Sequence, residues 1–154
     1  MIKEISYNDI CKLWKLLWPE KQLRPFSQMK FLGGKETKEE CELPRKIFYF
    51  GYYNKKTLVG VNSCHSQYLH MVKCVFRSRG LYVLPEYRKK GIGTKLLKHS
   101  SEVSFKFTNF IWSFPKQSSI EVYKAAGFIE RSPFASNYTK TQDDINCYVS
   151  IKNK

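Results

Sequence analysis

The chain has 154 residues, 42% hydrophobic and 16% aromatic, which excludes a disordered protein and predicts a single globular domain over residues 1–154. Its 27 Lys and Arg against 13 Asp and Glu give a net charge of +14, which favours polyanionic partners such as nucleotides, nucleic acid or an acidic lipid surface. The lysines are scattered along the chain, which argues against a dedicated nucleic-acid groove.

The first predicted elements are a short strand over residues 2–6 and a helix that follows it. Ser6 and Asp9 have the spacing of a capping box, in which a serine hydroxyl accepts a hydrogen bond at the helix start. Apolar residues then recur with helical spacing and predict one broad apolar face, formed by Ile10, Leu13, Trp14, Leu17 and Trp18. Pro19 is expected to end this helix.

The middle of the chain predicts short helical pieces followed by a run of strands. Residues 27–32 and 36–42 fit single helical turns. The aromatic stretch 46–53, an Asn-Lys-Lys turn and the stretch from residue 57 to about 68 predict a β-hairpin. Residues 73–84 are predicted to form the next strand.

The last third of the chain alternates between helical and strand patterns. A helix is expected over residues 91–104 and a strand over residues 109–114. Two final strands are expected over residues 128–131 and 146–151. A further helix between the strands would be capped by Ser118 or Ser119 and would end at Gly127. This mixed order predicts an α+β fold with one largely antiparallel sheet and helices packed on its faces.

The stretch 81–94, with the sequence LYVLPEYRKKGIGT, has the order expected of an anion site. A strand is broken by Pro85, a basic turn containing glycines follows, and a helix begins. Turn glycines allow successive N–H groups to point at one place, and the helix start adds its own unpaired amides. A phosphate or pyrophosphate is the expected ligand.

The glycine spacing excludes the P-loop, and a single Gly-x-Gly is a weak signal for a dinucleotide site. The pattern present, Arg88-x-x-Gly91-x-Gly93 after an apolar strand, resembles the acetyl-CoA motif of the GCN5-related N-acetyltransferase (GNAT) superfamily. Downstream, residues 118–128 resemble the helix of that family that ends in Tyr, three residues and Gly-Phe. The resemblance extends over residues 46–129.

This resemblance implies an α+β, mostly antiparallel sheet of six to seven strands with helices on both faces. It also implies an acyltransferase that moves acetyl from acetyl-CoA, its co-substrate, to a primary amine by direct attack in a ternary complex. The residues expected to bind acetyl-CoA are Tyr82, Val83, Arg88, Lys89, Lys90, Gly91, Ile92, Gly93 and Thr94. Backbone N–H groups near the first two would bind the pantetheine arm and the thioester oxygen, and those of residues 89–94 the diphosphate.

Tyr123 matches the family's tyrosine and is the expected catalytic acid, which protonates the leaving thiolate of CoA. A phenol of pKa about 10 is a competent donor to a thiolate whose acid has a pKa of about 8.5. The alternative for Tyr123 is a core aromatic residue on the same helix face as Ile120. Candidate bases for the amine are His65, His70 and Glu86, acting through water, each with a surface or locally bonded role as the alternative.

The chain departs from the family pattern in one place. Lys116 and Ser119 stand where many members carry an Asn that touches the cofactor and an Ala. The Asn contact is therefore in doubt; for Lys116 the alternatives are a contact with a phosphate of CoA and a solvated side chain.

The five cysteines contain no Cys-x-x-Cys pair and are odd in number, which favours reduced thiols in a cytoplasmic protein. No metal site is expected, and a covalent relay through cysteine is disfavoured. The first residues are charged from Lys3 and lack an apolar signal region. No apolar stretch approaches about 18 residues, so no membrane partner is expected.

The acceptor is expected to be an amine of a small molecule or a protein. Acidic residues in the two segments that set specificity in the family would attract a lysine side chain, an N-terminus or a polyamine: Glu36, Glu39, Glu40, Glu42, Asp143 and Asp144. Solvated surface carboxylates are the alternative. The active form is expected to be a monomer or homodimer.

A non-catalytic role is the second hypothesis. In this hypothesis a chain of the same fold binds acyl-CoA without catalysis, or it binds nucleic acid through its net charge of +14. Nucleic acid is not favoured, because no zinc-finger or RNP-type motif accompanies the charge.

Overall fold

The computed structural model describes residues 1–18, 46–69, 73–131 and 149–153. Their elements in chain order are β1 (Ile2–Glu4), α1 (Tyr7–Leu17), β2 (Ile47–Asn54), β3 (Thr57–Leu69), β4 (Lys73–Val83), η3 (Pro85–Tyr87), α3 (Ile92–Ser104), β5 (Phe110–Ser113), η4 (Gln117–Ser119), α4 (Ile120–Ala125), β6 (Ile129–Glu130) and β7 (Val149–Lys152). The helical pieces predicted over residues 27–32 and 36–42 lie outside the described residues. The predicted final strand over 146–151 does so in part.

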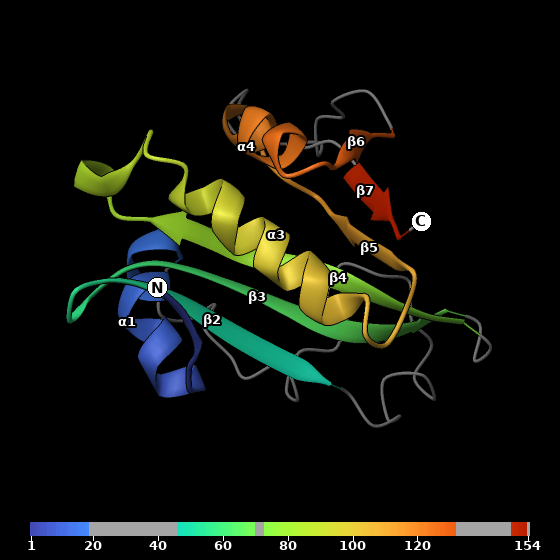
Figure 1. Ribbon diagram of the computed structural model, residues 1–154, viewed down its shortest axis with the longest axis horizontal. Coiled ribbons are helices and arrows are strands. Elements are labelled where there is room, and N and C mark those ends of the chain that lie inside the picture. The colour runs from blue at the N-terminus through green and yellow to red at the C-terminus, as the bar shows by residue number, and fades with distance from the viewer. Residues whose placement is uncertain (19–45, 70–72, 132–148, 154) are drawn as a thin grey trace.

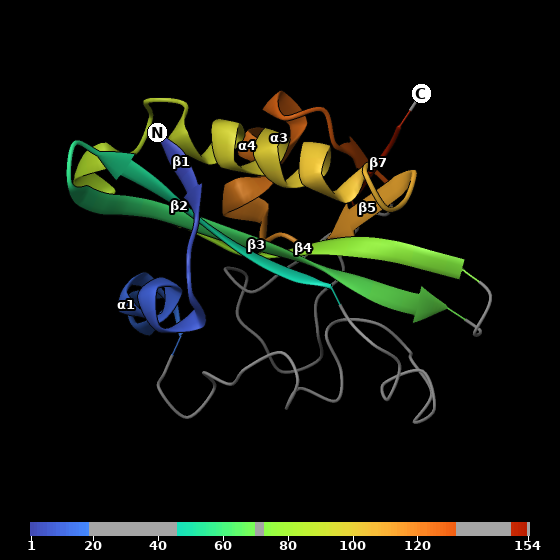
Figure 2. The same cartoon turned by 60° about the horizontal axis from the view of Figure 1, so that its bottom comes forward.

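One seven-stranded sheet organises the described chain, in the order β1-β2-β3-β4-β5-β7-β6. All neighbouring strands are antiparallel except β4 and β5, which run parallel. Figure 2 shows α1 on one face of this sheet and α3 and α4 on the other. The α+β fold with helices on both faces is therefore confirmed.

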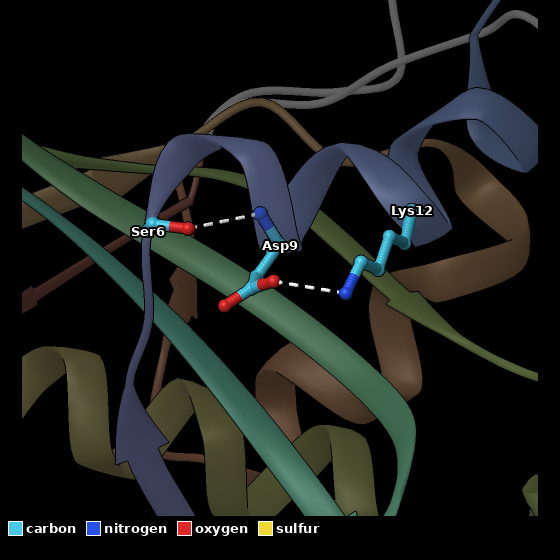
Figure 3. A network of polar contacts seen from close by, with 3 residues as sticks. All are labelled: Ser6, Asp9 and Lys12. Atoms are coloured by element: carbon cyan, nitrogen blue, oxygen red, sulfur yellow. Dashed lines mark hydrogen bonds and ion pairs between the residues drawn. The ribbon is translucent and has the colours of Figure 1, made fainter.

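Helix α1 starts where the sequence predicts. The Ser6 hydroxyl accepts a hydrogen bond from the Asp9 backbone N–H (3.1 Å), and the Asp9 carboxylate pairs with Lys12 at 3.0 Å (Figure 3). This pairing lowers the pKa of Asp9, and Asp9 raises that of Lys12. The apolar face of α1 buries Ile10 and Trp14 completely against the sheet.

Helix α3 covers the opposite face and holds the main core. Its buried side chains include Ile92, Leu96 and Leu97, which pack with Phe50, Phe76 and Ile111 of the strands. Buried serines also face the sheet from α3. They are satisfied locally, since the hydroxyl of Ser101 donates to the Leu97 carbonyl and that of Ser104 donates to the Ser100 carbonyl.

Two irregularities shift the alternation of side chains along the central hairpin. Val59 is unpaired between the Tyr52–Gly60 and Tyr53–Leu58 pairs. Further on, Asn62 lies opposite two residues of β4, Gly80 and Leu81, because Val61 pairs with Tyr82 and Ser63 with Arg79. Each is a β-bulge, which bends the strand and re-aims the side chains beyond it.

Helix α4 begins differently from the expected serine cap. Ser119 occupies its N-cap position, but its hydroxyl makes no capping hydrogen bond. The 3-10 turn η4 leads directly into α4, so the helix begins from a tightened turn and has no side-chain cap.

Candidate active site

The basic turn between β4 and α3 presents unpaired backbone amides. Lys89 (φ 62°) and Gly91 (φ 79°) both adopt the left-handed conformation, and Gly91 is the N-cap of α3. The first amide of the helix to find an acceptor is Lys95 N–H, which donates to the Gly91 carbonyl at 3.1 Å. Within the described residues, the N–H groups of 89–94 make no hydrogen bond. Such a row of donors at a helix start fits a diphosphate.

The side chains of the turn have distinct surroundings. Arg88 folds back onto the end of β4, where its Nε donates to the Val83 carbonyl at 2.8 Å and its guanidinium lies 5.3 Å from the Tyr82 ring. Lys89 and Lys90 are exposed, and Lys90 lies over the Tyr87 ring. Arg88 therefore stabilises the turn, while the two lysines remain exposed to solvent.

The remaining predicted cofactor residues pack against the protein. Ile92 is buried in the core, so only its amide is available to a ligand. A Cβ on Gly93 would lie 3.0 Å from Val122 Cγ1, so glycine here lets α3 approach α4 closely. A Cβ on Gly91 would meet nothing within 4 Å, and its positive φ is what favours glycine at that position. Thr94 is half-buried in the first helical turn.

Strands β4 and β5 part to form a fork. They pair only at Phe76–Ile111 and Arg77–Trp112, and Figure 1 shows their ribbons diverging beyond this point. At the point of divergence the Ser113 hydroxyl donates to the Ser78 carbonyl at 2.9 Å. Residues of β4 after Arg77, including Tyr82 and Val83, therefore have no β5 partner within the described chain.

Tyr123 of α4 reaches into this fork. Its Oη lies 3.4 Å from Ser113 Oγ, and the residue is only 5% exposed. A serine hydroxyl has one proton, and the Ser78 carbonyl can only accept it, so in the contact with Tyr123 the phenol O–H is the donor and Ser113 Oγ the acceptor. Burial raises the pKa of Tyr123, and the charge of Arg77 offsets this rise in part.

The end of α4 holds Tyr123 in place. Phe128 N–H donates to the Tyr123 carbonyl and Gly127 N–H to the Lys124 carbonyl, both at 3.0 Å, with Gly127 at φ 98°. This is a Schellman motif, and its usual apolar contact is the edge-to-face packing of Phe128 on Tyr123, with ring centres 5.4 Å apart. The Tyr-x-x-x-Gly-Phe pattern thus has a physical basis, and the predicted C-terminal cap is confirmed.

A buried polar network lies beneath Tyr123 on the same face. Asn62 Nδ2 donates to the hydroxyls of Ser78 (3.0 Å) and Ser100 (2.9 Å). The network links β3, β4 and α3 and ends beside the fork. Each amide proton of Asn62 has an acceptor, so the network fixes the strand spacing there.

The candidate bases are separated in the structure. His65 is buried on β3, with its Nδ1 3.0 Å from the Ser66 carbonyl, and it is paired in register with Arg77. Glu86 is exposed in η3. His70 lies outside the described residues, as do all six acidic residues assigned to the acceptor mouth. The assignment of a base stays a prediction.

The two described cysteines of the sheet, Cys64 and Cys74, are poor nucleophiles. Cys64 is completely buried, and burial raises its pKa to about 12. Burial also raises the pKa of Cys74, which is half-buried on β4. Neither provides the low-pKa, accessible thiolate that a covalent relay needs.

Sequence reasoning missed several residues at the fork: Asn62, Ser78, Ser113, Gln67 and Arg77. Ser113 carried a weak signal, because it is a polar residue between the apolar run Phe110–Trp112 and Phe114. The others resemble ordinary alternating strand residues, and only the register brings them together.

The family of the chain follows from its sequence match. The model described as the acetyltransferase (GNAT) family matches residues 7–128, and the chain belongs to this family. No curated protein matches the sequence significantly. Within the described ranges, every helix is too short or too polar to serve as a membrane span.

Solved acetyltransferases share the fold at low sequence identity. The ribosomal-protein-S18-alanine N-acetyltransferase of Escherichia coli is 16% identical with a TM-score of 0.65, over 99% of this chain and 92% of that one. A Bacillus subtilis acetyltransferase in complex with CoA is 15% identical with a TM-score of 0.65, over 99% and 98%. A spermidine N-acetyltransferase chimera from Vibrio cholerae is 16% identical with a TM-score of 0.62, over 99% and 94%.

Proposed function

We propose that the chain is a single-domain N-acetyltransferase that transfers acetyl from acetyl-CoA to a primary amine by direct attack in a ternary complex. The observation that carries this proposal is the row of unpaired N–H groups at residues 89–94, next to a fork that contains Tyr123. The similar protein from Bacillus subtilis was solved with CoA, and those from Escherichia coli and Vibrio cholerae are named for amine acceptors.

Different residues of the chain would bind the diphosphate, bind the pantetheine arm and stabilise the oxyanion. The amides of 89–94, with Lys89 and Lys90, would hold the diphosphate of acetyl-CoA. The β4 backbone beyond Arg77 would bind the pantetheine arm as a replacement for the missing strand partner. An N–H group near Tyr82 or Val83 would stabilise the developing oxyanion, which is worth about 3 kcal/mol for a well-placed donor.

Tyr123 would act on the leaving group. Because its pKa is raised by burial, the phenol is protonated at neutral pH and has a proton to give. Its position in the fork, 3.4 Å from Ser113 Oγ, would place that proton beside the thiolate that leaves the acetyl group. Acetyl-CoA supplies the activated acetyl group, and the acceptor amine must lose a proton to a base or to water.

The test is a calorimetric titration of the purified chain with acetyl-CoA, with ATP and a short DNA duplex as controls. Micromolar, one-to-one binding of acetyl-CoA alone is expected. Gly91→Val should weaken it at least about tenfold, because a branched side chain disfavours the φ of 79° that aims the amides. Binding of DNA without acetyl-CoA would instead support the charge-driven nucleic-acid alternative.

A further inference from the structure

Three polar or aromatic side chains from neighbouring strands meet on the α1 face of the sheet, beside the fork. Arg77 of β4 is paired in register with Trp112 of β5, and its guanidinium carbon lies 4.9 Å from the centre of the indole ring. Gln67 of β3 contacts the same indole through a side-chain hydrogen bond of 3.0 Å. We call these three residues the Trp112 cluster.

The orientation of the Gln67 amide in this cluster is fixed by chemistry. An indole N–H can only donate, so the atom that faces Trp112 Nε1 must be the Gln67 carbonyl oxygen, Oε1. The amide nitrogen Nε2 therefore points elsewhere. It is buried, and within the described part of the chain no group accepts a hydrogen bond from it.

Arg77 contributes a second unused donor. Its Nε is buried and has no hydrogen-bond partner among the residues that the structure describes. The ion pairs of the described residues join Asp9 to Lys12 and Lys124 to Glu121 and Glu130, and none of them involves Arg77. Burial and the nearby charge of Arg79 lower the pKa of Arg77 to about 10, so it is still a cation at neutral pH.

Both unused groups are donors, and one carries a positive charge. Buried donors without acceptors are rare, because each loses its hydrogen bonds to water and gains none in return. Positively charged donors next to a neutral amide donor match one kind of ligand, an oxyanion with several lone pairs. A guanidinium in particular suits a planar carboxylate.

We propose that the Trp112 cluster binds the carboxylate of the acceptor, so that the acceptor is a small amine bearing a carboxylate, such as an amino acid. This inference rests on the proposed N-acetyltransferase function. It is narrower than that function, because polyamines and protein lysines lack a carboxylate near the amine.

The place of the cluster relative to the fork supports this assignment. Arg77 and Trp112 are the last paired residues before the strands part, and the next residues, Ser78 and Ser113, are those beside Tyr123. Successive residues of a strand point to opposite faces. A small acceptor whose carboxylate is held by Arg77 would therefore direct its amine into the fork, toward the side on which Tyr123 lies.

The first experiment compares matched acceptors that differ only in the carboxylate. L-Alanine, L-methionine and L-glutamate are paired with their α-amides, spermidine is added as a polyamine, and release of CoA thiol is followed with acetyl-CoA in excess. An amine beside an amide is less basic than one beside a carboxylate, so amine reactivity favours the amides. A lower KM for the acids is expected, and it would have to come from recognition of the carboxylate.

Arg77→Gln should raise the KM for the acids about 10- to 100-fold and leave the amides unchanged, which is the usual cost of one charged hydrogen bond. Arg79→Gln is the matched control, because it removes the same charge two residues along β4 and should keep the preference for acids. An equal loss for acids and amides in Arg77→Gln would overturn the proposal and assign Arg77 to the electrostatics of Tyr123. Preference for spermidine or the amides in the unmodified chain would also overturn it.

A second experiment needs neither cofactor nor turnover. Gln67→Glu keeps an oxygen for Trp112 to donate to and replaces the unused donor with a carboxylate next to Arg77. If the cluster is built for an anion, this variant supplies one permanently, and its thermal midpoint should rise while acids no longer bind. A midpoint that falls would contradict the proposal.

The two proposals fail separately. If acetyl-CoA does not bind in the titration, the acetyltransferase function is wrong, whatever Gln67→Glu does. If acetyl-CoA binds but the acids neither react nor change the tryptophan fluorescence of the cofactor-bound chain, the carboxylate site alone is wrong. Trp112→Phe should abolish any acid-induced fluorescence change.

Discussion

Trp14 of α1 and Gly80 of β4 fit so closely that the indole fills the space a side chain at position 80 would need. The indole Nε1 donates to the Gly80 carbonyl at 2.8 Å, and a Cβ on Gly80 would lie 2.5 Å from ring atoms of Trp14. Gly80 also has a φ of 78° and lies in the β4 bulge. One contact thus fixes α1 against the strand that leads to the glycine turn.

Gly80→Ala should destabilise the fold by about 2–4 kcal/mol, because the left-handed conformation and the clash with a rigid, buried ring add together. Urea unfolding followed by tryptophan fluorescence measures the change. Gly91→Ala is the control, with a similar φ but no atom within 4 Å of the new Cβ, and should cost only about 1 kcal/mol. Equal losses in the two variants would mean that the contact with Trp14 is not tight.

Tyr123→Phe should lower kcat about 100-fold and leave the Kd for acetyl-CoA within about twofold, because it removes the proton donor but keeps the ring against Phe128. CoA-thiol release and calorimetry measure the two quantities. Tyr52→Phe, on β2, is the control and should turn over normally. Normal turnover in Tyr123→Phe would show that another group protonates the thiolate.

The pH dependence follows from the direction of the Tyr123 pKa. In the proposed role the protonated phenol is the active form, and burial raises its pKa, so this group should cause no loss of kcat at neutral or mildly alkaline pH. The rate should rise from pH 6 to 9 as the acceptor amine loses its proton. A fall in kcat below pH 9 that disappears in Tyr123→Phe would contradict the assignment.

Ser113→Ala should reduce kcat about three- to tenfold, because the hydroxyl that fixes the fork and lies beside the phenol is lost. It should also cost about 1–2 kcal/mol of stability, since the buried Ser78 carbonyl loses its donor. Ser101→Ala is matched to it, as a buried hydroxyl that donates only to the Leu97 carbonyl. A variant of Ser101 with the same loss of kcat would show that the effect is not specific to the fork.

Cys64→Ala should retain full turnover and lose about 1–2 kcal/mol of stability through the small cavity it leaves. In the folded protein at pH 8, Cys64 should resist iodoacetamide, because its pKa is about 12 and it is completely buried, while the half-exposed Cys11 reacts. Peptide mapping by mass spectrometry locates the modified thiol. Loss of turnover without loss of folding would revive a covalent mechanism.

The sequence predicts the order of elements well where local signals are strong. Residue types that favour one backbone conformation predict three features: the helix cap at Ser6, the left-handed end of α4 at Gly127 and the glycine turn. The two bulges have no such signal. Val59 and Val61 are two residues apart, yet the first packs under α3 and the second under α1, because the bulge at Val59 reverses the alternation.

The grouping of Gln67, Arg77 and Trp112 could not be predicted from the sequence for the same reason. Which face Gln67 and Arg77 occupy depends on the register of β3 with β4, and that register includes the bulge at Gly80 and Leu81. The glycine turn between β4 and α3, by contrast, is continuous in sequence, so its residues lie together whatever the register. Sites built from one segment can be predicted from spacing, whereas sites built across strands cannot.

The fork between β4 and β5 also leaves an edge of β4 without a β5 partner in the middle of the described sheet. Unpaired strand edges are templates for pairing with another chain, and proteins protect them with charges and bulges. Beyond Arg77, β4 carries both, as Arg79 and the bulge at Gly80. A ligand bound in this opening would therefore also cover an unpaired strand edge.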